Sequence, residues 1–264
     1  MLALHTWTLD TTPLAEALGV ARGVGWDGIE LRRVDFARAA AEGRSAADVL
    51  ALVGASGLAL ACVGVEFGWM WAEGPERRRL LQVFDEQCAH AAALGCPTVM
   101  SPVDTGRGDL RRAAESVREV GELAAKHGVR LAVEFNSQAG QLNALGRMRE
   151  VLAKAGHPHS GLLLDTYHLW RSGATLRDVD DVGRDEIVYV QFSDVPASVE
   201  PGKVTDRLPP GCGVVPFKEF FALVEAKGYR GFMSYEAPNP AVWARPAEAV
   251  AREALEATRA HLPR

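Results

Sequence analysis

Short apolar runs alternate with longer amphipathic stretches along the chain. The runs are rich in Leu, Val, Ile and Ala and are bounded by Gly, Pro or polar residues, which is typical of β-strands. The pattern occurs eight times. The predicted strands are Leu2–Trp7, Gly28–Leu31, Ala59–Val65, Thr98–Met100, Val129–Glu134, Gly161–Asp165, Ile187–Phe192 and Gly231–Tyr235.

The stretches between these runs repeat their apolar residues with a period near 3.6, which predicts helices. Several of them end in a glycine, which adopts the left-handed backbone conformation that closes a helix. These glycines are Gly95, Gly128, Gly156 and Gly228. The clearest predicted helices are Arg77–Leu94, Asp109–His127, Leu142–Ala155, Pro216–Lys227 and Pro246–His261.

Regular alternation of strands and helices predicts a parallel sheet with crossover helices. Eight units favour a closed (β/α)8 TIM barrel over an open sheet, and 264 residues is close to the roughly 250 typical of that fold. No G-x-G-x-x-G follows the first strand, and no G-x-x-x-x-G-K-[ST] occurs. We therefore predict that residues 1–264 form a single α/β TIM-barrel domain. Its longest irregular segment, Asp194–Val215, is expected to help build the functional site.

Composition limits the partners of the chain. The formal net charge is −5, whereas nucleic-acid-binding proteins usually carry a basic face. No apolar run approaches the roughly 18 residues of a membrane span, and the first ten residues lack a leader pattern. The four cysteines show no C-x-x-C spacing. We expect a soluble, cytoplasmic protein without nucleic-acid or membrane partners, and the sequence leaves a homo-oligomer open.

A carboxylate or an amide lies at the end of each of the last four predicted strands. These residues are Glu134, Asp165, Gln191 and Glu236. Strands of a parallel barrel converge at their carboxyl ends, so the four side chains are expected to point into one mouth. Three carboxylates without a cation would repel one another, and a hard divalent ion removes that penalty. The four residues are therefore predicted to bind one metal ion.

Oxygen donors suit Mg²⁺, Mn²⁺ or Co²⁺ better than a thiolate-rich site would. Mn²⁺ is the predicted ion, with Mg²⁺, Co²⁺ and Zn²⁺ as alternatives. The competing interpretation is that the four residues are helix N-caps or surface groups that happen to follow strands.

Two further residues are candidates for binding the substrate. The D-x-x-H spacing of Asp165 and His168 lets both side chains approach one ligand, and His168 could donate a hydrogen bond to a substrate oxygen. Arg207, in the long segment, could bind two oxygens of a substrate with its planar guanidinium. A structural histidine, and a loop salt bridge from Arg207 to Asp206 or Asp194, are the alternatives.

Residues after the first and third strands could line the same pocket. His5 and Trp7 end the first strand, Glu66 follows the third, and Trp69 and Trp71 come shortly afterwards. Aromatic faces pack against the apolar side of a sugar, and a carboxylate at a strand end is costly unless it is used or solvated. Core packing and covering by a loop compete with this role for the tryptophans.

The segment from about Val129 to Glu236 resembles the xylose-isomerase-like TIM barrel superfamily of sugar isomerases and epimerases. Three stretches carry the resemblance, and they are most similar to 2-keto-myo-inositol (inosose) isomerases: Ala132-Val-Glu134-Phe, Gly161-Leu-Leu-Leu-Asp165-Thr-Tyr-His168 and Asp206-Arg207-Leu-Pro-Pro-Gly-Cys-Gly213. The resemblance implies that Glu134, Asp165 and Glu236 bind a divalent metal. Most relatives carry histidine where this chain has Gln191, whereas hydroxypyruvate isomerases carry glutamine in a similar stretch.

The predicted activity is isomerisation or epimerisation of a small polyhydroxy ketone, namely a ketose, an inosose or a hydroxy-keto acid. A metal polarises the carbonyl, and Glu134 and Glu236 serve as catalytic base and acid on either side of an enediolate. A dehydratase of the inosose or dehydroshikimate type is the main alternative. An endonuclease-IV-like phosphodiesterase would need several metals and a basic groove, and a sugar-binding protein without turnover is a further alternative.

Overall fold

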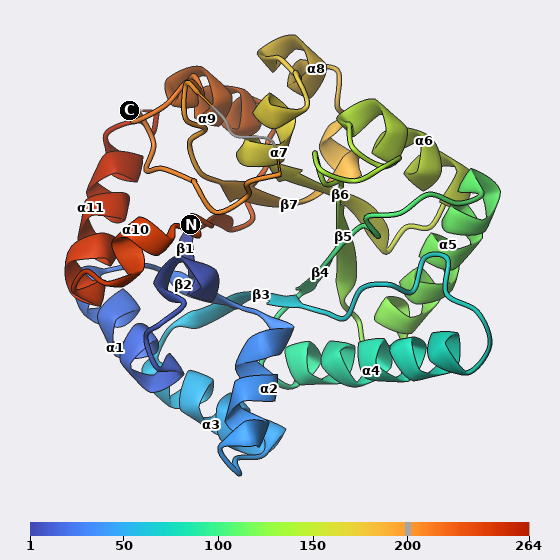
Figure 1. Cartoon of the computed structure of the whole chain (residues 1–264), viewed down its shortest axis with the longest axis horizontal. Helices are drawn as coiled ribbons and strands as arrows, with labels where there is room; N and C mark the ends of the chain where they lie inside the picture. The colour runs from blue at the N-terminus through green and yellow to red at the C-terminus, as the bar shows by residue number, and fades with distance from the viewer. Residues whose placement is uncertain (199–201, 264) are drawn as a thin grey trace.

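The eight strands close into one parallel barrel in chain order, as shown by the computed structural model, which describes residues 1–198 and 202–263. This confirms the predicted TIM barrel, and Figure 1 shows its ring of helices around the strands. The strands begin and end close to the predicted positions. They are β1 (Leu2–His5), β2 (Gly28–Leu31), β3 (Ala59–Gly64), β4 (Thr98–Pro102), β5 (Arg130–Glu134), β6 (Ser160–Asp165), β7 (Ile187–Phe192) and β8 (Met233–Tyr235).

Helices follow the strands and form the outer layer. The four predicted helix-ending glycines all have positive φ, at 65° for Gly95, 69° for Gly128, 57° for Gly156 and 78° for Gly228, which confirms that part of the prediction. The helices are α1 (Leu14–Val24), α2 (Arg33–Ala41), α3 (Ala46–Ser56), α4 (Gly74–Ala93), α5 (Leu110–Lys126), α6 (Leu145–Ala155), α7 (Thr166–Arg171), α8 (Leu176–Asp180), α9 (Phe217–Ala226), α10 (Pro240–Trp243) and α11 (Ala247–Arg259), with short 3₁₀ turns at Thr6–Leu9 and Arg184–Glu186.

The apolar core has two layers. The larger layer lies between the strands and the helices. A smaller cluster fills the barrel interior and includes Ala132, Leu163 and Tyr189. Small and large residues share this interior, as expected for a packed barrel rather than a pore. Among the described residues, no helix is long and apolar enough to span a membrane.

The carboxyl ends of the strands share one end of the barrel, because neighbouring strands all run parallel. The predicted irregular segment between β7 and α9 leaves the barrel at this end, and residues 199–201 of it lie outside the described part. Asp194 and Leu208 form an isolated antiparallel bridge within it. The strand ends and this segment therefore contribute to the same region.

Gly161, near the start of β6, has no room for a side chain, so its replacement is predicted to destabilise the protein. A Cβ atom at Gly161 would lie 2.7 Å from the carbonyl oxygen of Glu186 and 2.7 Å from a methyl group of Val188. Gly161→Ala should therefore lower the free energy of unfolding by about 1–3 kcal/mol, since close-packed strands must shift. Urea denaturation measures this change.

Gly19→Ala is the matched control for this substitution. Gly19 lies inside α1, and no atom beyond its chain neighbours and the nearby backbone of its own helix would come within 4 Å of the added methyl group. Alanine has a higher helix propensity than glycine, so this substitution should raise the free energy of unfolding by up to about 1 kcal/mol. Equal unfolding midpoints for the wild type and Gly161→Ala would contradict the packing argument.

Candidate active site

The structure brings the four predicted metal-ligating residues to the carboxyl end of the barrel. Glu134 ends β5, Asp165 ends β6, Gln191 is the penultimate residue of β7, and Glu236 directly follows β8. Asp165 and Gln191 are register partners on adjacent strands. All four side chains are buried. The convergence expected from barrel topology therefore occurs.

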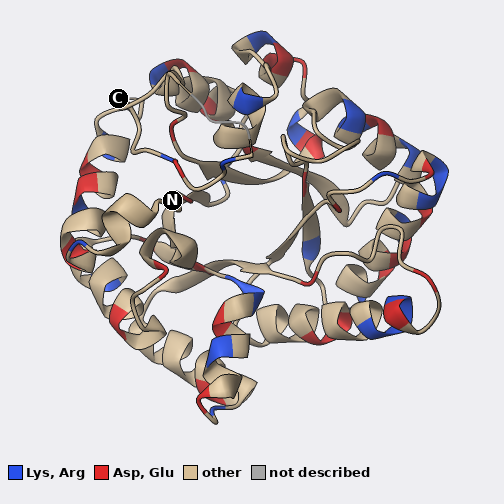
Figure 2. Ribbon diagram, in the orientation of Figure 1, with Lys and Arg blue, Asp and Glu red and all other residues tan. Residues whose placement is uncertain are grey.

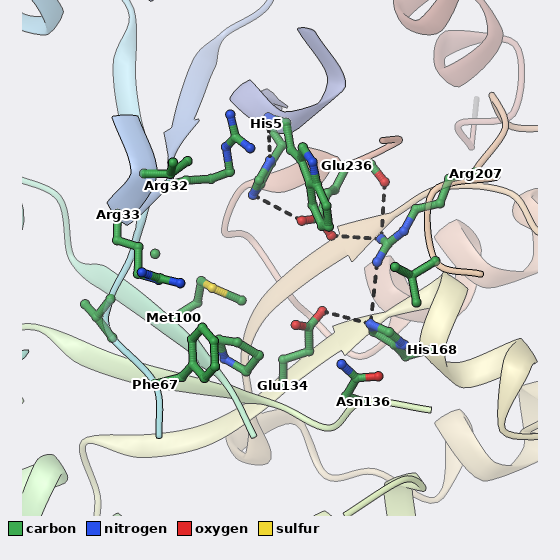
Figure 3. A pocket seen from close by; sticks show the side chains of 16 residues that line it. His5, Arg32, Arg33, Phe67, Met100, Glu134, Asn136, His168, Arg207 and Glu236 are labelled. Carbon is green, nitrogen blue, oxygen red and sulfur yellow. Dashed lines mark hydrogen bonds and ion pairs between the residues drawn. The ribbon is translucent and has the colours of Figure 1, made fainter. Parts of the chain in front are cut away.

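A cavity of about 310 Å³ opens at this end, a size that suits a small ligand. Glu134, Glu236, His168, Arg207 and His5 line it. Figure 3 shows these groups together on one side of the cavity, with the side chains of Arg33 and Phe67 on the other. Asp165 and Gln191 are fully buried and do not line the cavity.

Arg207 lies between two of the carboxylates. Its Nη1 donates to Asp165 Oδ2 and to Glu236 Oε2, both at 2.8 Å, and its guanidinium stacks 4.3 Å from the centre of the Tyr167 ring. Burial alone would lower the pKa of Arg207, but the nearby carboxylates raise it above its ordinary value. Arg207 therefore lies at the cavity, and its ion pairs are with Asp165 and Glu236.

Within residues 1–198 and 202–263, Arg207 forms neither of the alternative salt bridges, and both candidate partners have other contacts. Asp206 accepts a hydrogen bond from the Tyr167 hydroxyl at 2.5 Å. The buried Asp194 carboxylate accepts backbone N–H groups of Gly211, Gly213 and Val215 at 2.7–2.9 Å. Asp194 therefore holds together the segment that carries Arg207.

Burial and mutual repulsion perturb the carboxylates. Burial, followed by the charges of Glu236 and Asp165, raises the pKa of Glu134 well above its ordinary value. Burial also raises the pKa of Glu236 to about 7, although Arg207 opposes the change. These are the shifts expected when acidic groups are packed together with too little positive charge.

Among the residues that the structure describes, two buried oxygen atoms of the four strand-end side chains have no hydrogen-bond partner: Glu134 Oε1 and Gln191 Oε1. An unsatisfied buried acceptor costs about 1–3 kcal/mol. Side-chain atoms of Glu134, Asp165 and His168 lie within 4.8 Å of one another, a spacing that suits one metal ion, and Glu236 does not belong to this group among the described residues. Carboxylate and amide oxygens with free lone pairs are suitable ligands for a divalent cation, and the negative charge of the acidic side chains attracts one.

Asp165 and His168 are linked by the start of α7. Asp165 Oδ1 accepts the N–H of Tyr167 at 2.9 Å and so caps the helix, while Oδ2 faces Arg207. His168 follows three residues later, on the first turn. Asp165 is therefore a helix cap through one carboxylate oxygen, and its other oxygen faces Arg207.

The tautomer of His168 follows from its contacts. The backbone N–H of Ser137 donates to His168 Nδ1 at 3.2 Å, which assigns the proton of a neutral ring to Nε2. Arg207 Nη2, itself a donor, lies 3.5 Å from Nε2 and would need the opposite tautomer, but this longer contact is the weaker of the two. Burial lowers the pKa of His168 to about 4, Asp165 opposing and Arg207 adding to the effect. His168 Nε2 lies 3.8 Å from Glu134 Oε1. The ring can thus donate a hydrogen bond toward a ligand in the cavity.

His5 is arranged in a similar way. Its Nδ1 accepts the N–H of Trp7 at 3.0 Å, which leaves Nε2 as the donor, 3.2 Å from Glu236 Oε1. Burial, with the charges of Arg32 and Arg207, holds the pKa of His5 well below its ordinary value. Glu236 is therefore held on one oxygen by His5 and on the other by Arg207.

Three residues expected from the sequence to line the pocket do not line the cavity: Glu66, Trp69 and Trp71. The indole N–H of Trp71 instead donates to the carbonyl oxygen of Asp109 at 3.2 Å. Trp69 is 1% exposed, packs edge-on against Phe84 and donates to Ser101 Oγ at 3.1 Å, so the structure places it in the core. The side chain of Glu66 faces Arg33, with 3.4 Å between Oε1 and Nη1. The alternative prediction for the tryptophans, packing in the core, is therefore correct for Trp69. Trp7, by contrast, lines the cavity.

Several residues of this region were not singled out from the sequence. Arg32, Arg33 and Asn136 line the cavity, and Glu30 is fully buried beside Gln191. Glu30 interrupts the apolar run Gly28–Leu31, and a charged residue inside a predicted buried strand is a signal that could have identified it. The arginines carry no comparable signal, because exposed arginines are common on this chain.

Comparisons with known proteins agree with this architecture. Residues 18–261 match the family described as xylose isomerase-like TIM barrel. An inosose isomerase of Halalkalibacterium halodurans is 26% identical over 190 residues, which cover 69% of this chain and 67% of that protein. A 3-dehydroshikimate dehydratase of Pseudomonas putida is 26% identical over 254 residues, which cover 92% of this chain.

The chain spans only 39% of the length of that dehydratase. Among solved structures, the crystal structure of the IolI protein with a bound zinc atom superposes with a TM-score of 0.87, covering 100% of this chain and 99% of that one. At 17% identity, this likeness shows the fold alone. The two relatives from Halalkalibacterium halodurans and Pseudomonas putida are thus an isomerase and a dehydratase.

Asp194 gives a test of how the Arg207 segment is held. Asp194→Asn would turn an NH₂ group toward backbone N–H donors, and the loss of a charged acceptor should lower the free energy of unfolding by about 1.5–3 kcal/mol. Asp109→Asn is the matched control, because Asp109 caps α5 at the surface and asparagine caps equally well. If both variants unfold at the same urea concentration, the Asp194 carboxylate is not what stabilises the segment.

Proposed function

The chain belongs to the xylose isomerase-like TIM barrel family, and on that premise we propose that it is a divalent-metal-dependent isomerase or epimerase of a small polyhydroxy ketone. The observation that carries the proposal is the buried cluster of Glu134, Asp165 and Glu236 at a small cavity, with unpartnered oxygens on Glu134 and Gln191. A ketose, an inosose or a hydroxy-keto acid would fit the chemistry.

Glu134, Asp165, Gln191 and Glu236 are the proposed ligands of one ion. Mn²⁺ is proposed because all four would present oxygen, with Mg²⁺, Co²⁺ and Zn²⁺ as alternatives. The zinc atom in the similarly folded IolI protein supports a divalent ion in such a barrel. When bound, the ion would polarise the substrate carbonyl and make the adjacent C–H more acidic.

Glu134 and Glu236 are the proposed acid and base. They come from β5 and β8, three strands apart in the eight-stranded ring, so they approach a ligand from different directions. One carboxylate removes the proton from the carbon beside the carbonyl, which leaves an enediolate. Return of a proton to the opposite face of that carbon gives the epimer, and its return to the former carbonyl carbon gives the isomer.

Neighbouring residues would orient these groups. His168 can donate its Nε2 proton to a substrate oxygen, and Arg207 can stabilise negative charge that develops on the substrate. His5 and Arg207 fix the Glu236 carboxylate from both sides. The small cavity limits the substrate to a few carbons or a single ring.

A dehydratase is the second candidate, and it is favoured by the similarity to 3-dehydroshikimate dehydratase over 92% of this chain. Proton removal would be the same, but loss of a β-hydroxyl as water would follow. Dehydration gives an unsaturated ketone that absorbs in the ultraviolet, whereas isomerisation and epimerisation do not, so absorbance distinguishes a dehydratase from an isomerase or epimerase. A phosphodiesterase is less well supported, since acidic and basic residues are interspersed over the outer helices (Figure 2) and the net charge is −5.

Deuterium exchange tests the proposal directly. The protein is incubated in deuterated water with Mn²⁺ and a panel of ketoses, inososes and hydroxypyruvate, and deuterium beside the carbonyl is measured by mass spectrometry. Glu134→Gln should slow exchange roughly 10²- to 10⁴-fold, because an amide cannot accept the proton. Glu150→Gln, on the exposed face of α6, should exchange normally. An unaffected Glu134→Gln would exclude Glu134 as the acid or base.

Metal preference tests Gln191. Gln191→His should still bind a divalent ion but shift its preference from Mn²⁺ toward Zn²⁺, because imidazole is a good zinc ligand. Competition titration of the two ions against the wild type and the variant measures the ratio of their dissociation constants. An unchanged ratio would count against Gln191 as a ligand.

A further inference from the structure

Glu30 is a buried carboxylate that the proposed chemistry does not use. It lies on β2, at a register irregularity between β2 and β3, and its side chain is fully buried. Irregularities of this kind redirect side chains. The carboxylate faces β7 and lies 3.7 Å from His5 Nε2. A carboxylate in this position is unfavourable unless it has a specific task.

Both oxygens of Glu30 accept hydrogen bonds from β7. Gln191 Nε2 donates to Oε1 at 2.8 Å, and the Tyr189 hydroxyl donates to Oε2 at 3.1 Å. Tyr189 and Gln191 are two residues apart on one strand, so both side chains point to the same face. Glu30 therefore connects β2 to β7 through the barrel interior.

The contact with Glu30 decides which end of the Gln191 amide is available. The NH₂ and carbonyl ends have nearly the same size, so only their hydrogen bonds distinguish them. Because the NH₂ group donates to Glu30, the carbonyl oxygen is directed away from it. That oxygen is buried and has no hydrogen-bond partner in the described part of the chain, and the adjacent register partner of Gln191 is Asp165.

We infer that Glu30 is a positioning residue that holds the Gln191 amide with its carbonyl oxygen turned toward the cation site. The inference rests on the proposed function, since it requires that Gln191 be a metal ligand. Without the acceptor on Glu30, the amide is free to rotate, and its NH₂ group would then face the cation with a partial positive charge.

The decisive measurement is the affinity of the intact protein for Mn²⁺ alone, without substrate, followed by the electron paramagnetic resonance signal of free Mn²⁺. Glu30→Leu removes the acceptor at similar volume and should weaken Mn²⁺ binding about 10- to 100-fold. Glu30→Gln keeps one acceptor oxygen for Gln191 and can donate to the Tyr189 hydroxyl, so it should recover most of the affinity. Tyr189→Phe, which leaves the bond to Gln191 in place, should bind like the wild type.

A double-mutant cycle separates positioning from general damage to the barrel. In a Gln191→Leu background, Glu30→Leu should cause no further loss of Mn²⁺ affinity, because no amide is left to orient. An equal loss in both backgrounds, or wild-type binding by Glu30→Leu, would overturn the inference and leave the proposed function standing. Absence of Mn²⁺ binding by the wild type would overturn both.

An exchanged pair decides the matter if Glu30→Leu does not fold. Glu30→Gln combined with Gln191→Glu keeps the volumes and the hydrogen bond but reverses donor and acceptor. The pair should bind Mn²⁺ at least as tightly as the wild type, because residue 191 again presents one oxygen to the cation while its other oxygen accepts from the amide at position 30. A loss of affinity of about 10-fold or more would overturn the inference.

Discussion

The ion pairs of Arg207 with Asp165 and Glu236 are the interaction on which the site depends. Several acidic groups are buried at one end of the barrel, and water cannot screen their repulsion there. One guanidinium, 2.8 Å from each of two carboxylates, compensates part of that charge. Because Arg207 belongs to a segment held by Asp194, the charge balance of the site depends on the local fold of the β7–α9 connection.

Most of the fold and the acidic part of the site could be predicted because topology determines both. The alternation of strand and helix patterns is sufficient to indicate a parallel barrel, and in such a barrel the ends of β5 to β8 must meet. Glu134, Asp165 and Glu236 could thus be grouped without any knowledge of their rotamers. The spacing of three residues predicts that His168 lies near Asp165, because Asp165 caps α7 and His168 lies on its first turn.

The rest depends on side-chain packing that sequence patterns do not encode. Trp69 occupies the place in the sequence expected of a pocket wall, yet its ring turns toward Phe84 in the core. Glu30 stands out in the sequence as a charged residue inside an apolar strand, but the pattern shows neither its depth nor its partners. Its hydrogen bonds to Tyr189 and Gln191 join residues about 160 positions apart in the chain.

The double engagement of Asp165 bears on how such barrels diverge. One of its oxygens starts α7, and the other belongs to the charged cluster. A related barrel without enzymatic activity would still gain stability from an aspartate here, because the side chain caps the helix. An aspartate at this position in a related sequence is therefore weak evidence of enzymatic activity. A residue that caps no helix, such as Glu134, is more informative about activity.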